Sequence, residues 1–228
     1  MRAFALAALI AAAQLTGEAR AQVPPSPEEI AAYTGLHAAA AHGDVGSLER
    51  LSSLKPDFEA RDRFGRTPLH VAVFMKQRAA VRALLARGAN PNALEQRRYD
   101  PVTIAAVADD VETLRILLAG GASAKNITSP YDGTALIAAA HLGHETVVLE
   151  LIRAGAPLDH VNNLGWTALI ESIVLGNGGI RHIQTLRYIV EAGANMNLAD
   201  RQGRTPLALA RQQGFREMEA ILRRAGAR

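Results

Sequence analysis

The sequence predicts an all-α solenoid built from helix-turn-helix repeats, and three observations lead to this prediction. The stretch Arg66–Ala72 contains a helix start, because Thr67 is a good N-cap and Pro68 suits the first helical position. The position of His70 has counterparts along most of the chain at a nearly constant spacing. Glycine followed by alanine closes each later unit, and glycine supplies the left-handed conformation that ends a helix. One such unit cannot bury its own apolar face, so we expect the units to stack.

The period of the repeat is about 33 residues. The positions equivalent to His70 are His37, Thr103, Ile137, Ile170 and Ala208. The closing pairs are Gly88-Ala89, Gly121-Ala122, Gly155-Ala156, Gly193-Ala194 and Gly226-Ala227. These positions divide the chain into six repeats, approximately residues 33–61, 62–94, 95–128, 129–161, 162–199 and 200–228.

Aliphatic residues at helical spacing predict a second helix in each repeat, as at Val81 and Leu84. The two end units differ from the interior ones. Ser52 in the first unit, and Glu219 and Arg223 in the sixth, stand where interior units have aliphatic residues. Terminal repeats need a polar outer face for solubility. We therefore expect two capping repeats, a complete array and a monomer.

The Thr67–Ala72 motif, the glycine–alanine closures and the period resemble the ankyrin-repeat family over roughly residues 33–228. This resemblance implies an ankyrin-repeat solenoid with β-turn fingers between the helix pairs. It also implies that His37 and His70 make hydrogen bonds that fix these turns. Residues 132–140 and 165–170 resemble exported bacterial members of the family, which implies a bacterial periplasmic protein.

Four departures from the regular pattern predict local differences. The first repeat has Lys55-Pro56 in place of the closing pair. Arg98 occupies the position of a turn glycine, and Asp132-Gly133 lies one residue out of register. We therefore expect the third and fourth fingers to close differently from the others. The fifth repeat has five extra residues between its helices, within residues 176–181.

Composition excludes several classes of function. The chain of 228 residues is 49% hydrophobic and 21% charged, so it has a globular composition. It contains no cysteine, which excludes disulfides, thiolate metal sites and cysteine nucleophiles. The formal net charge is only +3 and no long basic run is present, so we expect no nucleic-acid partner.

The first 21 residues predict a cleaved signal peptide. A positive start at Arg2 precedes an apolar run from Ala3 to Leu15, and an Ala-x-Ala sequence ends at Ala21. We place the cleavage after Ala21 and the mature protein in the periplasm, without a membrane span. An uncleaved anchor or a first helix of the fold is the alternative. Residues 22–32 are rich in proline and are expected to form an extended spacer.

No group of residues predicts catalysis, a cofactor or a metal site, so we do not expect an enzyme. His141 and His144 could share a helix face, but no carboxylate at ligand spacing accompanies them. Asp109 and Asp110 are adjacent at a turn, where carboxylates are usually solvated. No serine–histidine–aspartate set or phosphate-binding loop can be assembled.

The resemblance implies a protein partner, bound on the concave surface that the finger tips and the inner helices form. Five of the residues assigned to this surface are aromatic, and tyrosine, tryptophan and arginine contribute most of the binding energy at protein interfaces. The alternative is that these rings pack one finger against the next. The positions carried over to this chain are Arg63, Phe64, Arg66, Phe74, Met75, Arg97, Tyr99, Tyr131, His141, Leu142, Asn163, Trp166, Arg201 and Arg204.

The insertion in the fifth repeat carries a second hypothesis, the binding of a small anion or a glycan. Its glycines precede an expected helix that begins near Arg181, so backbone amides could point toward an anion. A flexible turn with a solvated arginine is the alternative. The residues of this candidate loop site are Asn177, Gly178, Gly179, Arg181 and His182.

Overall fold

The computed structural model describes residues 22–54 and 56–228, so the predicted signal peptide lies outside the described residues. Thirteen helices and no named strand form in the described part. They are α2 (Pro27–Ala32), α3 (Gly35–His42), α4 (Val45–Ser52), α5 (Pro68–Phe74), α6 (Arg78–Ala86), α7 (Pro101–Val107), α8 (Val111–Ala119), α9 (Ala135–Leu142), α10 (Glu145–Arg153), α11 (Ala168–Val174), α12 (Ile180–Glu191), α13 (Pro206–Gln213) and α14 (Arg216–Arg224).

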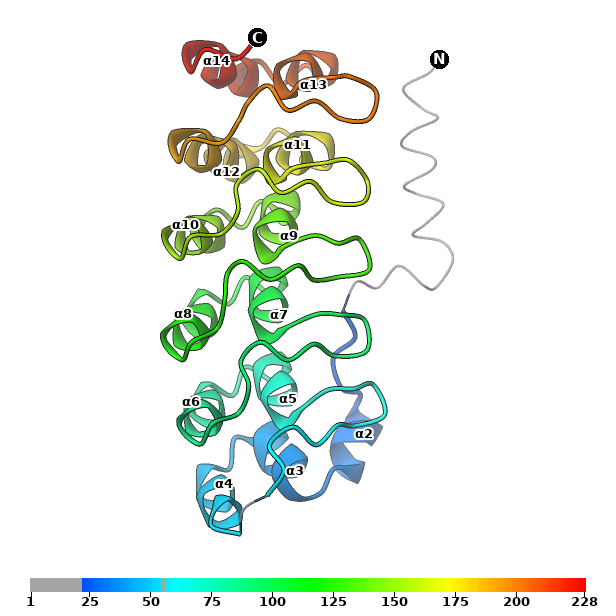
Figure 1. Ribbon diagram of the computed structural model, residues 1–228, viewed down its shortest axis with the longest axis vertical. Coiled ribbons are helices and arrows are strands. Elements are labelled where there is room, and N and C mark those ends of the chain that lie inside the picture. The colour runs from blue at the N-terminus through cyan, green and yellow to red at the C-terminus, as the bar shows by residue number, and fades with distance from the viewer. Residues whose placement is uncertain (1–21, 55) are drawn as a thin grey trace.

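The helices stack in two columns, as the sequence predicts (Figure 1). The inner column contains α3, α5, α7, α9, α11 and α13, and the outer column contains their partners α4, α6, α8, α10, α12 and α14. A long loop projects to the same side of the stack before each inner helix from α5 on, and we call these loops the second to sixth fingers. The prediction of an all-α solenoid of helix-turn-helix repeats is confirmed.

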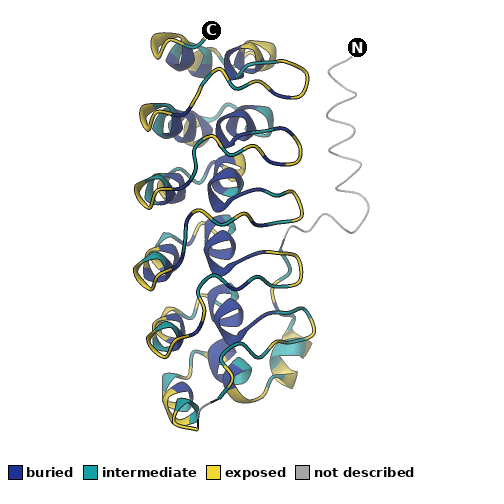
Figure 2. Cartoon of the chain, viewed as in Figure 1, coloured by how far each residue is buried: buried dark blue, intermediate teal, exposed yellow. Residues whose placement is uncertain are grey.

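The apolar core runs continuously through the stack between the two columns (Figure 2). Each interior repeat contributes aliphatic residues from both helices, such as Leu69 of α5 and Leu84 of α6. Alanine is frequent on the inner helices, and Ala72, Ala106 and Ala140 are fully buried. These small side chains let neighbouring helices approach closely, so the core is thin and each repeat packs mainly on its neighbours.

The helix termini form as the sequence predicts. Thr67 caps α5, because its hydroxyl accepts a hydrogen bond from the His70 amide while the His70 ring bonds back to the Thr67 amide. Side chains of the same kind cap the other inner helices from α7 on, and these are Asp100, Thr134, Thr167 and Thr205. The closing glycines all adopt positive φ, from +78° at Gly155 to +91° at Gly193.

Residues 22–32 differ from the expected spacer. Residues 22–26 are irregular, but α2 follows at Pro27, capped by Ser26 in a capping box with Glu29. This segment lies against the second and third repeats (Figure 1), and it bonds to Arg66 on the second finger and to Thr103 on α7. We call residues 22–33 the strap. Its proline-rich composition indicates an extended chain, but its long-range contacts hold it against the solenoid.

Candidate functional site

The fingers share one pattern of hydrogen bonds. In the second finger the Asp62 amide donates to the Arg66 carbonyl at 3.0 Å, and the Gly65 amide donates to the Asp62 carbonyl at 2.9 Å. The Asp62 carboxylate accepts from the amides of Phe64 and Arg66 at 2.8 and 2.9 Å. Glu95, Ser129, Asn162 and Asp200 each accept two amide bonds in the same way in the later fingers. A side-chain acceptor therefore fixes every turn.

The third finger closes with the same bonds as the others, which corrects our expectation. Arg98 takes the left-handed conformation at φ +66°, where the second finger has Gly65. The fourth finger does differ. It has positive φ at Ser129 and Asp132 and an isolated antiparallel bridge between Thr128 and Gly133, which accommodate its shifted register.

Hydrogen bonds join each finger to the next, and three of these four links run between backbone groups. The Gln96 amide donates to the Phe64 carbonyl at 3.0 Å, and the Ser129 amide donates to the Arg98 carbonyl at 2.9 Å. The Asn163 amide continues this series by donating to the Tyr131 carbonyl at 2.9 Å. The Arg201 guanidinium donates to the Asn163 carbonyl and so joins the sixth finger to the fifth. A partner would therefore meet a pre-ordered row of turns, which reduces the entropy lost on binding.

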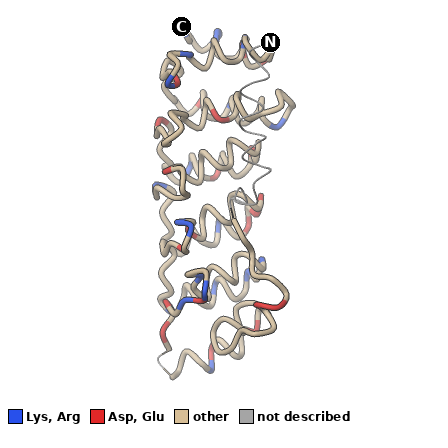
Figure 3. Tube along the Cα trace, turned by 90° about the vertical axis from the view of Figure 1, so that its right-hand side faces the viewer, with Lys and Arg blue, Asp and Glu red and all other residues tan. Residues whose placement is uncertain are grey.

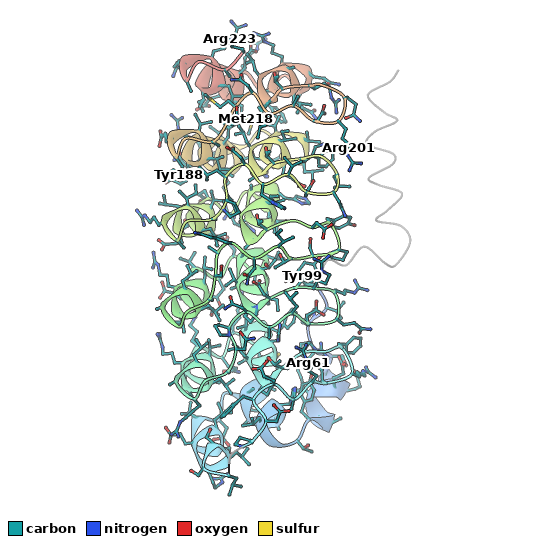
Figure 4. All side chains as sticks on the ribbon, in the orientation of Figure 1. Arg61, Tyr99, Tyr188, Arg201, Met218 and Arg223 are labelled. Carbon is teal, nitrogen blue, oxygen red and sulfur yellow. The ribbon has the colours of Figure 1, made fainter. Side chains whose placement is uncertain are left out.

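The structure divides the fourteen candidate surface residues by exposure. Those exposed to solvent are Arg63, Arg97, Tyr131, His141, Leu142, Asn163 and Arg201. Those of intermediate exposure are Phe64, Phe74, Met75, Trp166 and Arg204. Arg66 and Tyr99 are buried, with 1% and 4% of their surface exposed. Figure 4 shows Tyr99 at the base of the third finger and Arg201 near the end of the sixth.

Arg66 and Tyr99 therefore cannot contact a partner in this structure, and both assignments need correction. Each follows the left-handed residue of its finger, but the two are buried for different reasons: Val23 and Glu29 of the strap cover Arg66, and Tyr99 packs into the apolar core. Burial raises the pKa of the Tyr99 hydroxyl to about 12. The Tyr99 carbonyl accepts a hydrogen bond from His70 Nε2 at 3.3 Å, so the residue supports the turn. The Tyr99 ring is therefore part of the apolar core.

Most of the exposed large hydrophobic residues lie on the fourth and fifth fingers or at the end of the inner helix α9 between them. Of the seven large hydrophobic residues exposed in the described chain, five lie between residues 127 and 164. These five are Ile127, Tyr131, Leu142, Val161 and Leu164, with 39–48% of their surface exposed. We call them the apolar finger patch. Sequence reasoning found Tyr131 and Leu142 but missed the other three, because aliphatic residues at finger positions do not depart from any motif.

A buried carboxylate lies beside this patch. Glu171 of α11 is only 3% exposed, and its Oε1 atom accepts a hydrogen bond from Asn162 Nδ2 at 2.9 Å. His141 Nδ1 lies 3.6 Å from Glu171 Oε2. The sequence offered a signal that we missed. Glu171 directly follows Ile170, and the equivalent positions in other repeats hold Val71, Ile104, Ala138 and Leu209.

The insertion in the fifth repeat does not favour an anion site. The Arg181 guanidinium donates to Asp109 and Glu145, at 2.7 Å in both cases, so carboxylates already neutralise its charge. The Gly179 amide donates to Asn177 Oδ1 at 2.9 Å. His182 is buried, and its Nε2 donates to the His141 carbonyl at 2.9 Å. The helix α12 begins at Ile180, one residue before the expected start.

His144 and the paired aspartates also have structural partners. His144 Nδ1 donates to the Ala106 carbonyl at 2.9 Å. Asp110 caps α8 and pairs with Arg78 at 2.8 Å, so it is buried rather than solvated as we expected. In the part of the chain that the structure describes, no group of three or more histidine, aspartate or glutamate residues is placed to hold a metal ion. No described helix is both long and apolar enough to cross a membrane.

Comparisons with known proteins agree with this architecture. A family model described as ankyrin repeats, three copies, matches residues 9–95 and 102–181. The ankyrin repeat protein YahD of Escherichia coli K12 is 35% identical over 190 residues, which cover 83% of this chain and 94% of YahD.

Solved structures give the same result. An ankyrin repeat domain from Acinetobacter baumannii is 44% identical, with a TM-score of 0.81 over 85% of this chain and 98% of that domain. The ankyrin repeat domain of Bcl-3, a member of the IκB family, is 28% identical, with a TM-score of 0.77 over 86% of this chain and 88% of that domain.

Ankyrin-repeat proteins are generally scaffolds without enzymatic activity, and their repeats generally mediate protein–protein interactions. The matched residues, the identities and the finger geometry all lead to one assignment: this chain belongs to the ankyrin-repeat family.

Proposed function

We propose that this protein is an exported bacterial adaptor that binds a partner protein through its fingers and inner helices. The observation that carries the proposal is the apolar finger patch, which places four of the seven exposed large hydrophobic residues of the described chain on the fourth and fifth fingers and a fifth, Leu142, at the end of α9. Gathered apolar surface of this kind is typical of interaction sites. Half-buried Trp166 and exposed Asn163 on the fifth finger extend the patch with groups that suit a central anchor and a polar rim.

Charge does not favour another class of partner. Acidic and basic residues alternate along the stack without forming a single band (Figure 3). Many arginines pair with carboxylates, as Arg115 does with Glu150 at 3.0 Å and Arg98 with Asp132 at 2.7 Å. Nucleic-acid binding needs a continuous basic surface, so a protein remains the favoured partner.

The periplasmic location rests on the sequence. Cleavage after Ala21 would leave every strap contact in place, because these contacts begin at Gln22. Detecting the protein in periplasmic fractions, with Gln22 as its first residue, tests this part of the proposal. Finding it in the cytoplasm with an intact amino terminus would contradict it.

Cross-linking tests the proposed surface. A photoreactive amino acid at Leu164 on the fifth finger should give a defined product with a periplasmic protein, identified by mass spectrometry. The matched control carries the same group at Leu54, which is 75% exposed but lies after α4, away from the fingers. Equal products from both sites, or none from Leu164, would contradict the proposal.

A further inference from the structure

Residues 22–26 of the strap lie against the second and third repeats as an extended peptide would. Gln22 Nε2 donates to the carbonyl of Thr103 on α7 at 3.1 Å, although 81 residues separate the two. The Val23 carbonyl accepts a hydrogen bond from Arg66 at 3.1 Å. Pro25 is buried. Residues 22–26 therefore have no regular structure of their own and take their conformation from the solenoid.

Glu29 is the charged anchor of the strap. Its Oε1 atom accepts hydrogen bonds from Arg66 at 2.8 Å and from Arg63 at 3.0 Å, both on the second finger. Its Oε2 atom accepts from the Ser26 amide at 2.8 Å, which fixes the first turn of α2. The Glu29 side chain is 9% exposed, so these charge-assisted bonds are partly shielded from water.

The receiving surface is built around two guanidinium groups. Those of Arg63 and Arg66 lie 4.8 and 4.6 Å from the centre of the Phe64 ring. Arg66 also forms an ion pair with Asp62, with 2.6 Å between Nε and Oδ2. The Tyr33 hydroxyl donates a hydrogen bond to the same carboxylate oxygen at 2.6 Å. Arg66 would be the most costly of these groups to leave without a partner, because it is 1% exposed.

We propose that the second finger and the inner helix α7 form a groove for an extended acidic segment, and that the strap occupies this groove as an intramolecular competitor. The partner segment would be a stretch of protein without regular structure, followed by a carboxylate that takes the place of Glu29 between Arg63 and Arg66. This inference rests on the proposed function, because it assigns one part of the partner to one part of the surface. The apolar finger patch stays uncovered and remains available for first contact.

The strap lowers the apparent affinity of any competitor in a predictable way. It joins α3 through Thr34 alone, so its effective concentration at the groove is high. A competing segment binds only the fraction of molecules in which the groove is open, and its apparent dissociation constant rises in inverse proportion to that fraction. Weakening the strap should therefore strengthen binding in trans without changing the groove.

A peptide with the sequence of residues 22–33 is a defined probe of the groove. We compare its binding, by fluorescence anisotropy, to the full chain and to the Glu29→Ala and Glu28→Ala variants. Glu28 is the matched control, since it is exposed and its side chain accepts a hydrogen bond from the Ser26 hydroxyl within the strap. We expect at least a tenfold lower dissociation constant for Glu29→Ala than for the other two chains. The same peptide with alanine in place of its own Glu29 should bind none of them.

The outcomes separate the strap from the proposed function. Equal binding of the peptide to all three chains, or equal binding of the two peptides, would overturn the inference and leave the apolar finger patch untouched. If the peptide binds as expected but the apolar finger patch binds no partner, the proposed function is contradicted and the inference about the strap is not. If Glu29→Ala perturbs folding, as circular dichroism would reveal, replacing residues 22–26 with glycine and serine opens the same groove and must give the same tighter binding.

Discussion

His141 Nδ1 lies 3.6 Å from Glu171 Oε2. Glu171 stands where the second, third and sixth repeats bury Val71, Ile104 and Leu209. Burial raises the pKa of Glu171 to about 7, and partial desolvation of the half-exposed His141 ring, together with His182 and His144 nearby, lowers the pKa of His141. Both groups are therefore held toward their neutral forms beside the apolar finger patch. Glu171 keeps a hydrogen bond to Asn162 in either state of ionisation, so it links α11 to the fifth finger.

Glu171 should make stability depend on pH. Its pKa is raised in the folded state from a usual value of 4.5, so its contribution is fully present below about pH 4.5 and is lost as pH rises through about 7. Glu171→Leu should be more stable than the wild type, and the difference should widen by about 2 kcal/mol between pH 5 and pH 8. Urea unfolding at both values measures this. The same difference in unfolding free energy at both pH values would contradict the raised pKa of Glu171. Glu171→Gln is the control, because it removes the charge without adding apolar packing.

His70 should carry part of the stability of the third finger. Its Nδ1 atom accepts from the Thr67 amide, its Nε2 donates to the Tyr99 carbonyl, and burial lowers its pKa to about 4, so it stays neutral. His70→Ala leaves these groups unpaired and creates a cavity, which should cost about 3 kcal/mol in chemical denaturation. Exposed His42 is the matched control, and His42→Ala should change stability by less than about 0.5 kcal/mol. Similar losses would contradict the account.

The insertion in the fifth repeat should behave as a packed element. Gly178 has φ +68°, and an added Cβ would lie 2.5 Å from the Phe215 ring. Gly214 has φ +73° but open space around its Cβ position. Gly214→Ala should cost about 1 kcal/mol from backbone strain alone, and Gly178→Ala about 1–3 kcal/mol more from overpacking. Thermal unfolding of the two variants would show equal losses if the loop were free to move.

The strap should be released by acid. Burial opposes the ionisation of Glu29 and Asp62, but hydrogen bonds and the nearby arginines lower the pKa of both carboxyls overall. The stability that these groups give is present above their usual values of 4.5 and 3.8, and it is lost as pH falls through the lowered ones. Amide signals of Ile30 and Tyr33 in NMR spectra should therefore change below about pH 4 before those of the fifth repeat. A single transition for both would contradict the prediction.

The architecture could be predicted because each repeat depends on local signals. Thr67 and Pro68 start α5 whatever surrounds them, and Gly88 ends α6 for reasons of backbone geometry. The conformation of the third finger was harder to predict, because Arg98 replaces the glycine that closes the second, fifth and sixth fingers. Arg98 nevertheless adopts positive φ, and Glu95 accepts hydrogen bonds from both turn amides.

The candidate surface was only partly predictable, because exposure depends on distant residues. Arg66 occupies a variable finger position, but Glu29 and Val23 of the strap cover it. No local pattern in a proline-rich segment indicates that Gln22 bonds to Thr103. Glu171 could have been found by alignment of the repeats, whereas its raised pKa depends on packing that the sequence does not display.

The central claim is that the fourth and fifth fingers bind a protein partner. Once cross-linking has identified that partner, isothermal titration with the wild type, a Tyr131→Ala and Leu164→Ala double variant and Leu54→Ala tests the claim most directly. We predict that the double variant weakens binding at least tenfold, because it removes exposed apolar surface from both fingers, while Leu54→Ala changes the dissociation constant less than twofold. Unchanged affinity in the double variant, with its helical content intact, would contradict the claim.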